Sequence, residues 1–91
     1  MTEKELIAKV EDTMIKLYQN RELEGLQQVK DLLPVFQDMI QQILAVQMNQ
    51  ETMGYFTMLK ELVAGFQEQN MLGMADCLKQ NAFGLIECYY Q

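Results

Sequence analysis

The sequence predicts an all-α fold: an up-and-down antiparallel four-helix bundle formed by residues 1–91 as a single domain. Three observations predict it. Leu, Met, Gln, Glu and Lys dominate the composition, and these residues favour helix, whereas the 91 residues include one proline and five glycines. Apolar residues recur at the i, i+3, i+4, i+7 spacing of a helical face. The breaks between periodic segments are shorter than about five residues, which makes successive helices antiparallel neighbours.

The first helix is expected over residues 3–19. Thr2 and Glu5 have the spacing of a capping box, in which a hydroxyl and a carboxylate satisfy two backbone donors at a helix start. One face of this helix carries the apolar positions, which are Leu6, Ile7, Val10, Met14, Leu17 and Tyr18.

The second helix is expected to follow a break and N-cap at Asn20 and to continue to about Met48. Pro34 lies inside this segment, where it removes a backbone donor and clashes with the preceding turn. It either kinks one long helix or splits it near Leu33. The apolar phase matches on both sides of Pro34, with Leu26, Leu33 and Ile40 a heptad apart, and this favours one kinked helix.

The third helix is expected over residues 51–68 after Asn49, and the fourth from Asn70 to about residue 89. A three-helix bundle, with these last two merged or one of them short, is the alternative. The expected inward faces are Tyr55, Met58, Leu59, Leu62 and Phe66 in the third helix, and Met71, Met74, Ala75, Leu78, Ala82, Leu85 and Tyr89 in the fourth.

The fourth helix is apolar over more than half of its circumference, which is typical of a helix covered on several sides. One extra stripe holds small residues: Gly73, Cys77, Gly84 and Cys88. These allow a neighbouring backbone to approach closely. The other extra stripe, together with two residues of the third helix, is a candidate interface: Leu72, Phe83, Ile86, Tyr90, Phe56 and Val63. These six residues either complete a wide core or form an exposed patch for a homodimer contact or a partner helix.

Composition argues against most chemistry. The chain has no histidine, so the usual Ser/His and Cys/His nucleophile pairs and helical zinc or di-iron sites are excluded. We expect no catalytic residues, metal site or cofactor. The net charge of −6 disfavours binding to nucleic acid or an anionic membrane. Two cysteines and no secretory signal are typical of a cytoplasmic protein, with Cys77 and Cys88 as structural thiols too far apart to pair.

The segment Asn70-Met-Leu-Gly-Met-Ala75-Asp76-Cys77-Leu78 resembles a group of small, uncharacterised bacterial all-helical domains. Their last helix opens with a polar cap followed by Ala-Asp-x-Leu, and the resemblance covers the final third of this chain. Asn81 and Gly84 stand where those domains have a more acidic, proline-containing continuation. The resemblance implies a helical fold and a bacterial origin, and it implies no activity.

The hypothesis that follows is a small acidic helical bundle acting without catalysis through protein association, as an adaptor, accessory subunit or chaperone-like protein. Its partner is another protein or a second copy. At the level of fold it is similar to the small helical export chaperones of bacterial secretion and flagellar systems. The alternative is an enzyme or a carrier of a small ligand, with a cavity between helices lined by Met and by Tyr55 or Tyr89.

Overall fold

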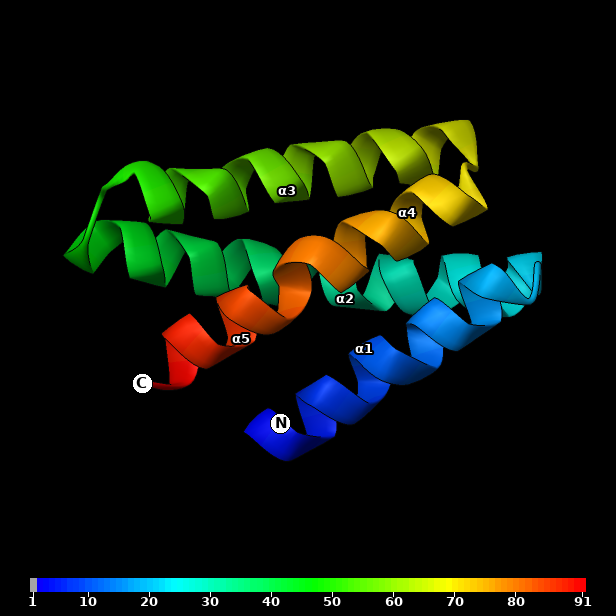
Figure 1. Cartoon of the computed structure of the whole chain (residues 1–91), viewed down its shortest axis with the longest axis horizontal. Coiled ribbons are helices and arrows are strands. Elements are labelled where there is room, and N and C mark those ends of the chain that lie inside the picture. The colour runs from blue at the N-terminus through cyan, green and yellow to red at the C-terminus, as the bar shows by residue number, and fades with distance from the viewer. Residues whose placement is uncertain (1) are drawn as a thin grey trace.

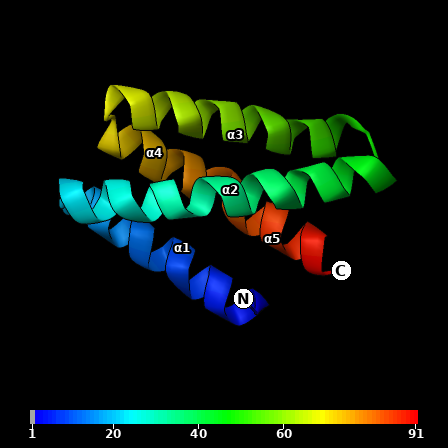
Figure 2. The same ribbon diagram turned by 180° about the vertical axis from the view of Figure 1, so that it is seen from behind.

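The computed structural model describes residues 2–91, and nearly all of them are helical. The helices are α1 (Glu3–Tyr18), α2 (Glu22–Val46) and α3 (Gln50–Glu68), followed by a fourth rod that consists of α4 (Met71–Cys77), a π-helical segment (Leu78–Ala82) and α5 (Phe83–Tyr90). Consecutive helices run antiparallel, and α4 returns to pack against both α1 and α3 (Figures 1 and 2). The predicted all-α four-helix bundle is confirmed.

Local side-chain caps set three of the four helix starts. The Thr2 hydroxyl accepts a hydrogen bond from the Glu5 backbone N–H at 3.1 Å. Asn49 and Thr52 form a reciprocal capping box, with both N–H···O distances at 2.9 Å. The Asn70 side chain accepts from the Gly73 N–H at 3.0 Å. These bonds satisfy donors that a helix start leaves unpaired, so the expected starts at Thr2, Asn49 and Asn70 are confirmed.

Two residues with positive φ mark the other boundaries. Asn20 has φ 60° and lies in the break between α1 and α2, as expected. The N-cap of α2 is Arg21, so the expectation that Asn20 caps this helix was wrong. Asn20 tolerates the left-handed conformation better than most residues do, which explains its place in the break. Gln69 has φ 55° and ends α3. Because this turn separates α3 from α4, the three-helix alternative is also wrong.

Helix α2 runs without interruption through Pro34. The splitting of this helix near Leu33 is therefore ruled out. The proline ring lies on the exposed side of the helix and displaces no core side chain. Its destabilising effect therefore comes from the missing backbone hydrogen bond and the local steric clash. The inward face on both sides of it is continuous, with Val29, Leu32, Phe36 and Ile40 all buried.

The core is formed by apolar side chains from every helix, and its largest fully buried members include Phe36, Leu6, Leu17, Leu62 and Leu85. Tyr18 was expected to face inward, but this is wrong. It is 45% exposed, and its hydroxyl donates a hydrogen bond to Asp76 Oδ1 at 3.0 Å. This bond joins the end of α1 to α4 at the surface.

The π-helical segment changes the direction in which α5 presents its side chains. A π turn closes its hydrogen bond over five residues instead of four, so each residue advances by less than the 100° of an α-helix. On a regular α-helical wheel Ile86 lies about 80° away from the inward stripe, and the wider turn rotates it back toward that stripe. Leu85 and Ile86 are both fully buried.

Close contacts hold α3 to the first half of the fourth rod. The Cys77 thiol donates to the backbone carbonyl oxygen of Met58 with an Sγ···O distance of 3.4 Å. A Cβ placed on Gly65 would lie 2.8 Å from Met74 Cγ, so glycine is what allows Met74 to pack against α3. Beyond the π-helical segment the rod no longer packs closely against α3. Helix α5 packs mainly against α1 and α2, and it diverges from α3 in both views (Figures 1 and 2).

Candidate functional site

A groove opens where α5 separates from the end of the α2–α3 hairpin. It has a volume of about 410 Å³ and is called the α5 groove below. Its lining residues come from the last turns of α2, the residue after it and the end of the chain: Gln42, Ile43, Val46, Gln47, Cys88, Tyr89 and Gln91. None of these side chains is charged, so the groove combines apolar surface with amide and hydroxyl groups.

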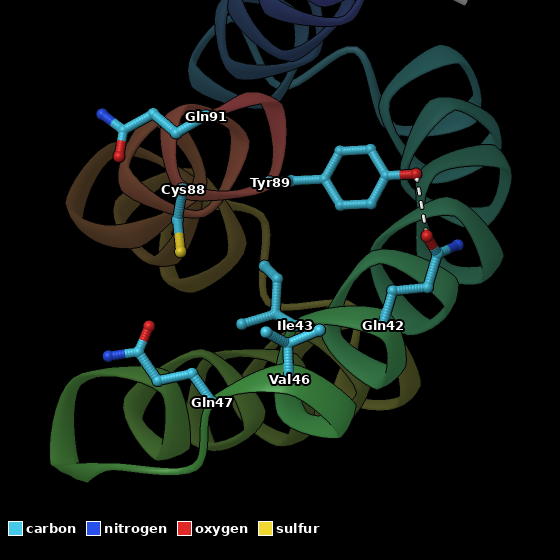
Figure 3. Close-up of a pocket in the computed structure, with 7 residues that line it drawn as sticks. All are labelled: Gln42, Ile43, Val46, Gln47, Cys88, Tyr89 and Gln91. Carbon is cyan, nitrogen blue, oxygen red and sulfur yellow. Dashed lines mark hydrogen bonds between the residues drawn. The ribbon is translucent and has the colours of Figure 1, made fainter.

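The two sides of the α5 groove are joined by one hydrogen bond. Tyr89 reaches across from α5, and its hydroxyl donates to Gln42 Oε1 at 3.2 Å (Figure 3). Ile43 and Val46 extend from α2 toward α5, and the Cys88 side chain extends toward α2 (Figure 3). Val46 is 90% exposed although it belongs to an apolar helix face, and Met48 just beyond it is 71% exposed. The end of the hairpin therefore presents apolar side chains that no helix covers.

The small residues of α5 line a second opening. Gly84 and Cys88 continue the small stripe that packs closely against α3 at Cys77, but at their level the α3 backbone is farther away, and the Tyr55 side chain reaches Gly84. They line a neighbouring hollow of about 280 Å³ with Tyr55, Glu51 and Glu87. The two hollows share Gln47, Cys88 and Gln91, so they form one depression that passes beneath the end of α5.

A third hollow adjoins the groove on the other side of Tyr89. It has a volume of about 380 Å³, and its lining includes Leu6, Pro34, Asp38, Met39 and Tyr90. Asp38 at its edge accepts a hydrogen bond from Gln42 Nε2 at 2.9 Å. Gln42 thus accepts from Tyr89 and donates to Asp38, which fixes the orientation of its amide at the groove wall.

Tyr55 carries a phenol hydroxyl group beside the groove, and the residue is buried. It donates to Glu51 Oε1 at 3.3 Å. Burial, and to a smaller extent the negative charge of Glu51, raise the pKa of Tyr55 above its ordinary value of 10.0. The phenol is therefore neutral near pH 7 and serves as a hydrogen-bond donor. A phenol in this state has no feature of an activated base.

The predicted interface residues do not form one surface. Of the two alternatives left open for these residues, core or interface, Ile86 belongs to the core, because it is fully buried. Phe83 and Val63 are half-buried, and Phe83 packs against the core. Leu72, Phe56 and Tyr90 are exposed by 60%, 43% and 39%, but they belong to three different elements. Of the six, Tyr90 lines a hollow beside the α5 groove. The Lys60 ammonium lies over the Phe56 ring, 5.7 Å from the ring centroid.

The residues that sequence reasoning missed are Ile43, Val46 and Met48. The apolar face of the second helix includes Ile43 and continues to about Met48, which predicts that this end is covered, and Val46 was not assigned to that face. No local pattern distinguishes them, because α3 begins at Gln50 and packs along α2, whereas the side left open depends on the divergence of α5 from α3.

The two thiols have different surroundings. Burial raises the pKa of the Cys77 thiol to about 11, and the nearby negative charge of Glu61 acts in the same direction. Cys77 is buried, whereas Cys88 is half-buried and lines the groove. This environment keeps Cys77 protonated at neutral pH, which fits the structural role expected from the sequence.

Residues 2–91 contain no cluster of three or more His, Cys, Asp and Glu side chains with the arrangement of a metal site. No helix in the same described range has the length and hydrophobicity needed to cross a bilayer. Comparison with protein-family models, with curated proteins and with solved structures gives no match to this chain.

Proposed function

We propose that this protein acts through association with another protein, without catalysis, and that the α5 groove is its contact surface. The observation that carries the proposal is the open end of the bundle. There an uncharged groove of about 410 Å³ lies beside Val46 and Met48, which are 90% and 71% exposed. Solvent-exposed apolar residues beside a concave surface are typical of a partner-binding site.

The proposed role is that of a cytoplasmic adaptor, accessory subunit or chaperone-like protein. Its negative surface charge repels polyanions, so the proposed partner is a protein and neither a nucleic acid nor a membrane. The absence of histidine removes the usual base that activates a nucleophile, and Cys77 is protonated, which supports a role without catalysis.

A photo-crosslinking amino acid introduced at Val46 tests the proposal in the native cell. We expect a discrete crosslinked protein from position 46 and none from Gln67, a control position that is exposed on α3 away from the groove. Equal crosslinking from both positions, or none from position 46, contradicts the proposal.

A small-ligand carrier is the second candidate function. The volume of the groove lies in the range typical of small-molecule sites, roughly 300–1,000 Å³. The Tyr89 hydroxyl and the amides of Gln42, Gln47 and Gln91 could orient a polar ligand. If purification from the native cell yields a stoichiometric small molecule, and Tyr89→Phe reduces its retention, the carrier function replaces association with a protein.

A further inference from the structure

We propose that the α5 groove binds an amphipathic helix of a partner protein whose apolar stripe is flanked by Lys and Arg. This inference rests on the proposed function and adds the chemistry of the partner. It follows from the distribution of charge around the groove, which differs from that of the rest of the molecule.

The parts of α2, α3 and α5 that surround the groove contain acidic side chains and no basic ones. Residues 32–59 and 80–91 include Asp38, Glu51 and Glu87 and no Lys or Arg. The first turn of α1, whose Leu6 lines the same hollow as Asp38, adds Lys4 between Glu3 and Glu5 and so no net positive charge. Asp38 lines the hollow on one side of the groove, and Glu51 and Glu87 line the hollow on the other. The seven basic residues all lie outside these segments: Lys4, Lys9, Lys16, Arg21, Lys30, Lys60 and Lys79.

These three carboxylates have hydrogen bonds but no ion pair within residues 2–91. Asp38 accepts from Gln42 Nε2 at 2.9 Å and Glu51 from the Tyr55 hydroxyl at 3.3 Å. Glu87 accepts from Gln91 Nε2 at 3.5 Å. By contrast, the four ion pairs of the described chain all lie among α1, the first half of α2 and Arg21 between them. The negative charge at the groove end is therefore not balanced by basic residues of its own.

The shape of the surface defines the rest of the partner. Its centre is uncharged and includes Ile43 and Val46, with acidic residues on either side. The complementary ligand has apolar side chains in the middle and positive charges at both edges. A helix with anchors at i, i+3, i+4 and i+7 has this pattern, and a cleft between two helices is the usual receptor for it. Charges at the rim chiefly select the partner and accelerate its association.

A second copy of this chain fits the groove less well. In a symmetric dimer the same surface contacts itself, so Asp38, Glu51 and Glu87 of one chain would face the same acidic residues of the other. Such like-charge contacts across an interface are destabilising. The start of α1, with Lys4 between Glu3 and Glu5, has no excess of positive charge to offer.

The test uses two synthetic helical peptides of about 18 residues with the same leucine anchors, one with Lys and one with Glu at the remaining positions. Binding to the intact protein is measured by fluorescence anisotropy at about 50 and 300 mM salt, and the site is mapped by amide NMR shifts. We expect the basic peptide to bind at least about tenfold more tightly than the acidic one, more weakly at high salt, and with shifts at residues 42–47 and 87–91.

Matched variants separate the local charge of the groove from the overall charge of the protein. The triple variant Asp38→Asn, Glu51→Gln, Glu87→Gln keeps the hydrogen-bond acceptors and removes three charges. We expect it to bind the basic peptide about tenfold more weakly. The control variant Glu11→Gln, Glu61→Gln, Glu68→Gln removes three exposed charges elsewhere and is expected to change affinity less than about twofold.

The inference is overturned if the basic peptide does not bind, if the acidic peptide binds as tightly, or if the two triple variants weaken binding equally. The crosslinking at Val46 reports separately on the proposed function. If the protein captured there binds through an acidic or neutral segment, the proposed function, association through the groove, is retained. The inference that the partner is a basic helix is then refuted.

Discussion

Cys77 and Cys88 share one face of the fourth rod and differ in their surroundings. Cys77 is buried against α3, where its thiol donates to the Met58 carbonyl, whereas Cys88 lines the open groove. With a pKa of about 11, Cys77 has only about 0.1% thiolate at pH 8. Its raised pKa has a consequence for folding. The stability that the protonated thiol contributes is full below about pH 9, the value for an unperturbed thiol, and is lost as pH rises toward 11.

We therefore expect a thiol-specific reagent at pH 8 to modify Cys88 at least about tenfold faster than Cys77. The single variants Cys77→Ser and Cys88→Ser assign the two rates, because each retains one thiol. In denaturant both thiols should react at similar rates, since the difference arises from the folded environment. If Cys77 reacts as fast as Cys88 in the folded protein, the buried, hydrogen-bonded environment described for Cys77 is wrong.

At the scale of the helix, Pro34 is the residue least suited to its position. It lies in the interior of α2, twelve residues after the helix begins at Glu22 and twelve before it ends at Val46. Proline in a helix interior costs about 3 kcal/mol relative to alanine, and part of this is offset because proline also restricts the unfolded chain. The continuous core face of α2 offsets the rest through burial of Val29, Leu32 and Phe36.

Pro34→Ala is expected to raise the free energy of unfolding by about 1–3 kcal/mol, because it restores the missing hydrogen bond to the Lys30 carbonyl without removing a buried side chain. Urea denaturation followed by circular dichroism measures the change. Gln37→Ala, at another exposed position of the same helix, is the control and should stay within about 0.5 kcal/mol. A loss of stability in Pro34→Ala would show that the packing of α2 depends on the proline.

Helix boundaries and the groove differ in how far the sequence predicts them. Caps such as Asn49 and Asn70 were predictable because each depends on a hydrogen bond to a backbone group three residues away. The sequence pattern left Ile86 undecided between core and interface, because the π-helical segment, which rotates α5, responds to tertiary packing that a regular wheel does not include. The exposure of Val46 depends on the divergence of α5 from α3, and no local pattern encodes it.

At the scale of the whole molecule, the bundle has a well-packed end and an open end. The packed end joins α1, the first half of α2, α3 and α4, and its interior includes the fully buried residues Leu17, Val29 and Met74. A hollow of about 360 Å³ beside Leu23 lies on its surface. At the open end the last six residues of α2 and the last four of α5 contain no fully buried side chain. Few buried apolar contacts mean a low free energy of local opening, so the elements that form the groove are also the least stable ones.

Hydrogen exchange tests this link between local stability and the proposed binding site. We expect the backbone amides of residues 43–46 and 87–90 to exchange at least about 100-fold faster than those of residues 29–36, because the former open without unfolding the core. Addition of the basic peptide should slow exchange at the first two segments and leave the third unchanged, since a ligand stabilises the state to which it binds. Uniform protection along α2 in the free protein would mean that its last turns are part of the cooperative core. In that case the groove would be a rigid, preformed surface, and the coupling between local opening and binding would be wrong.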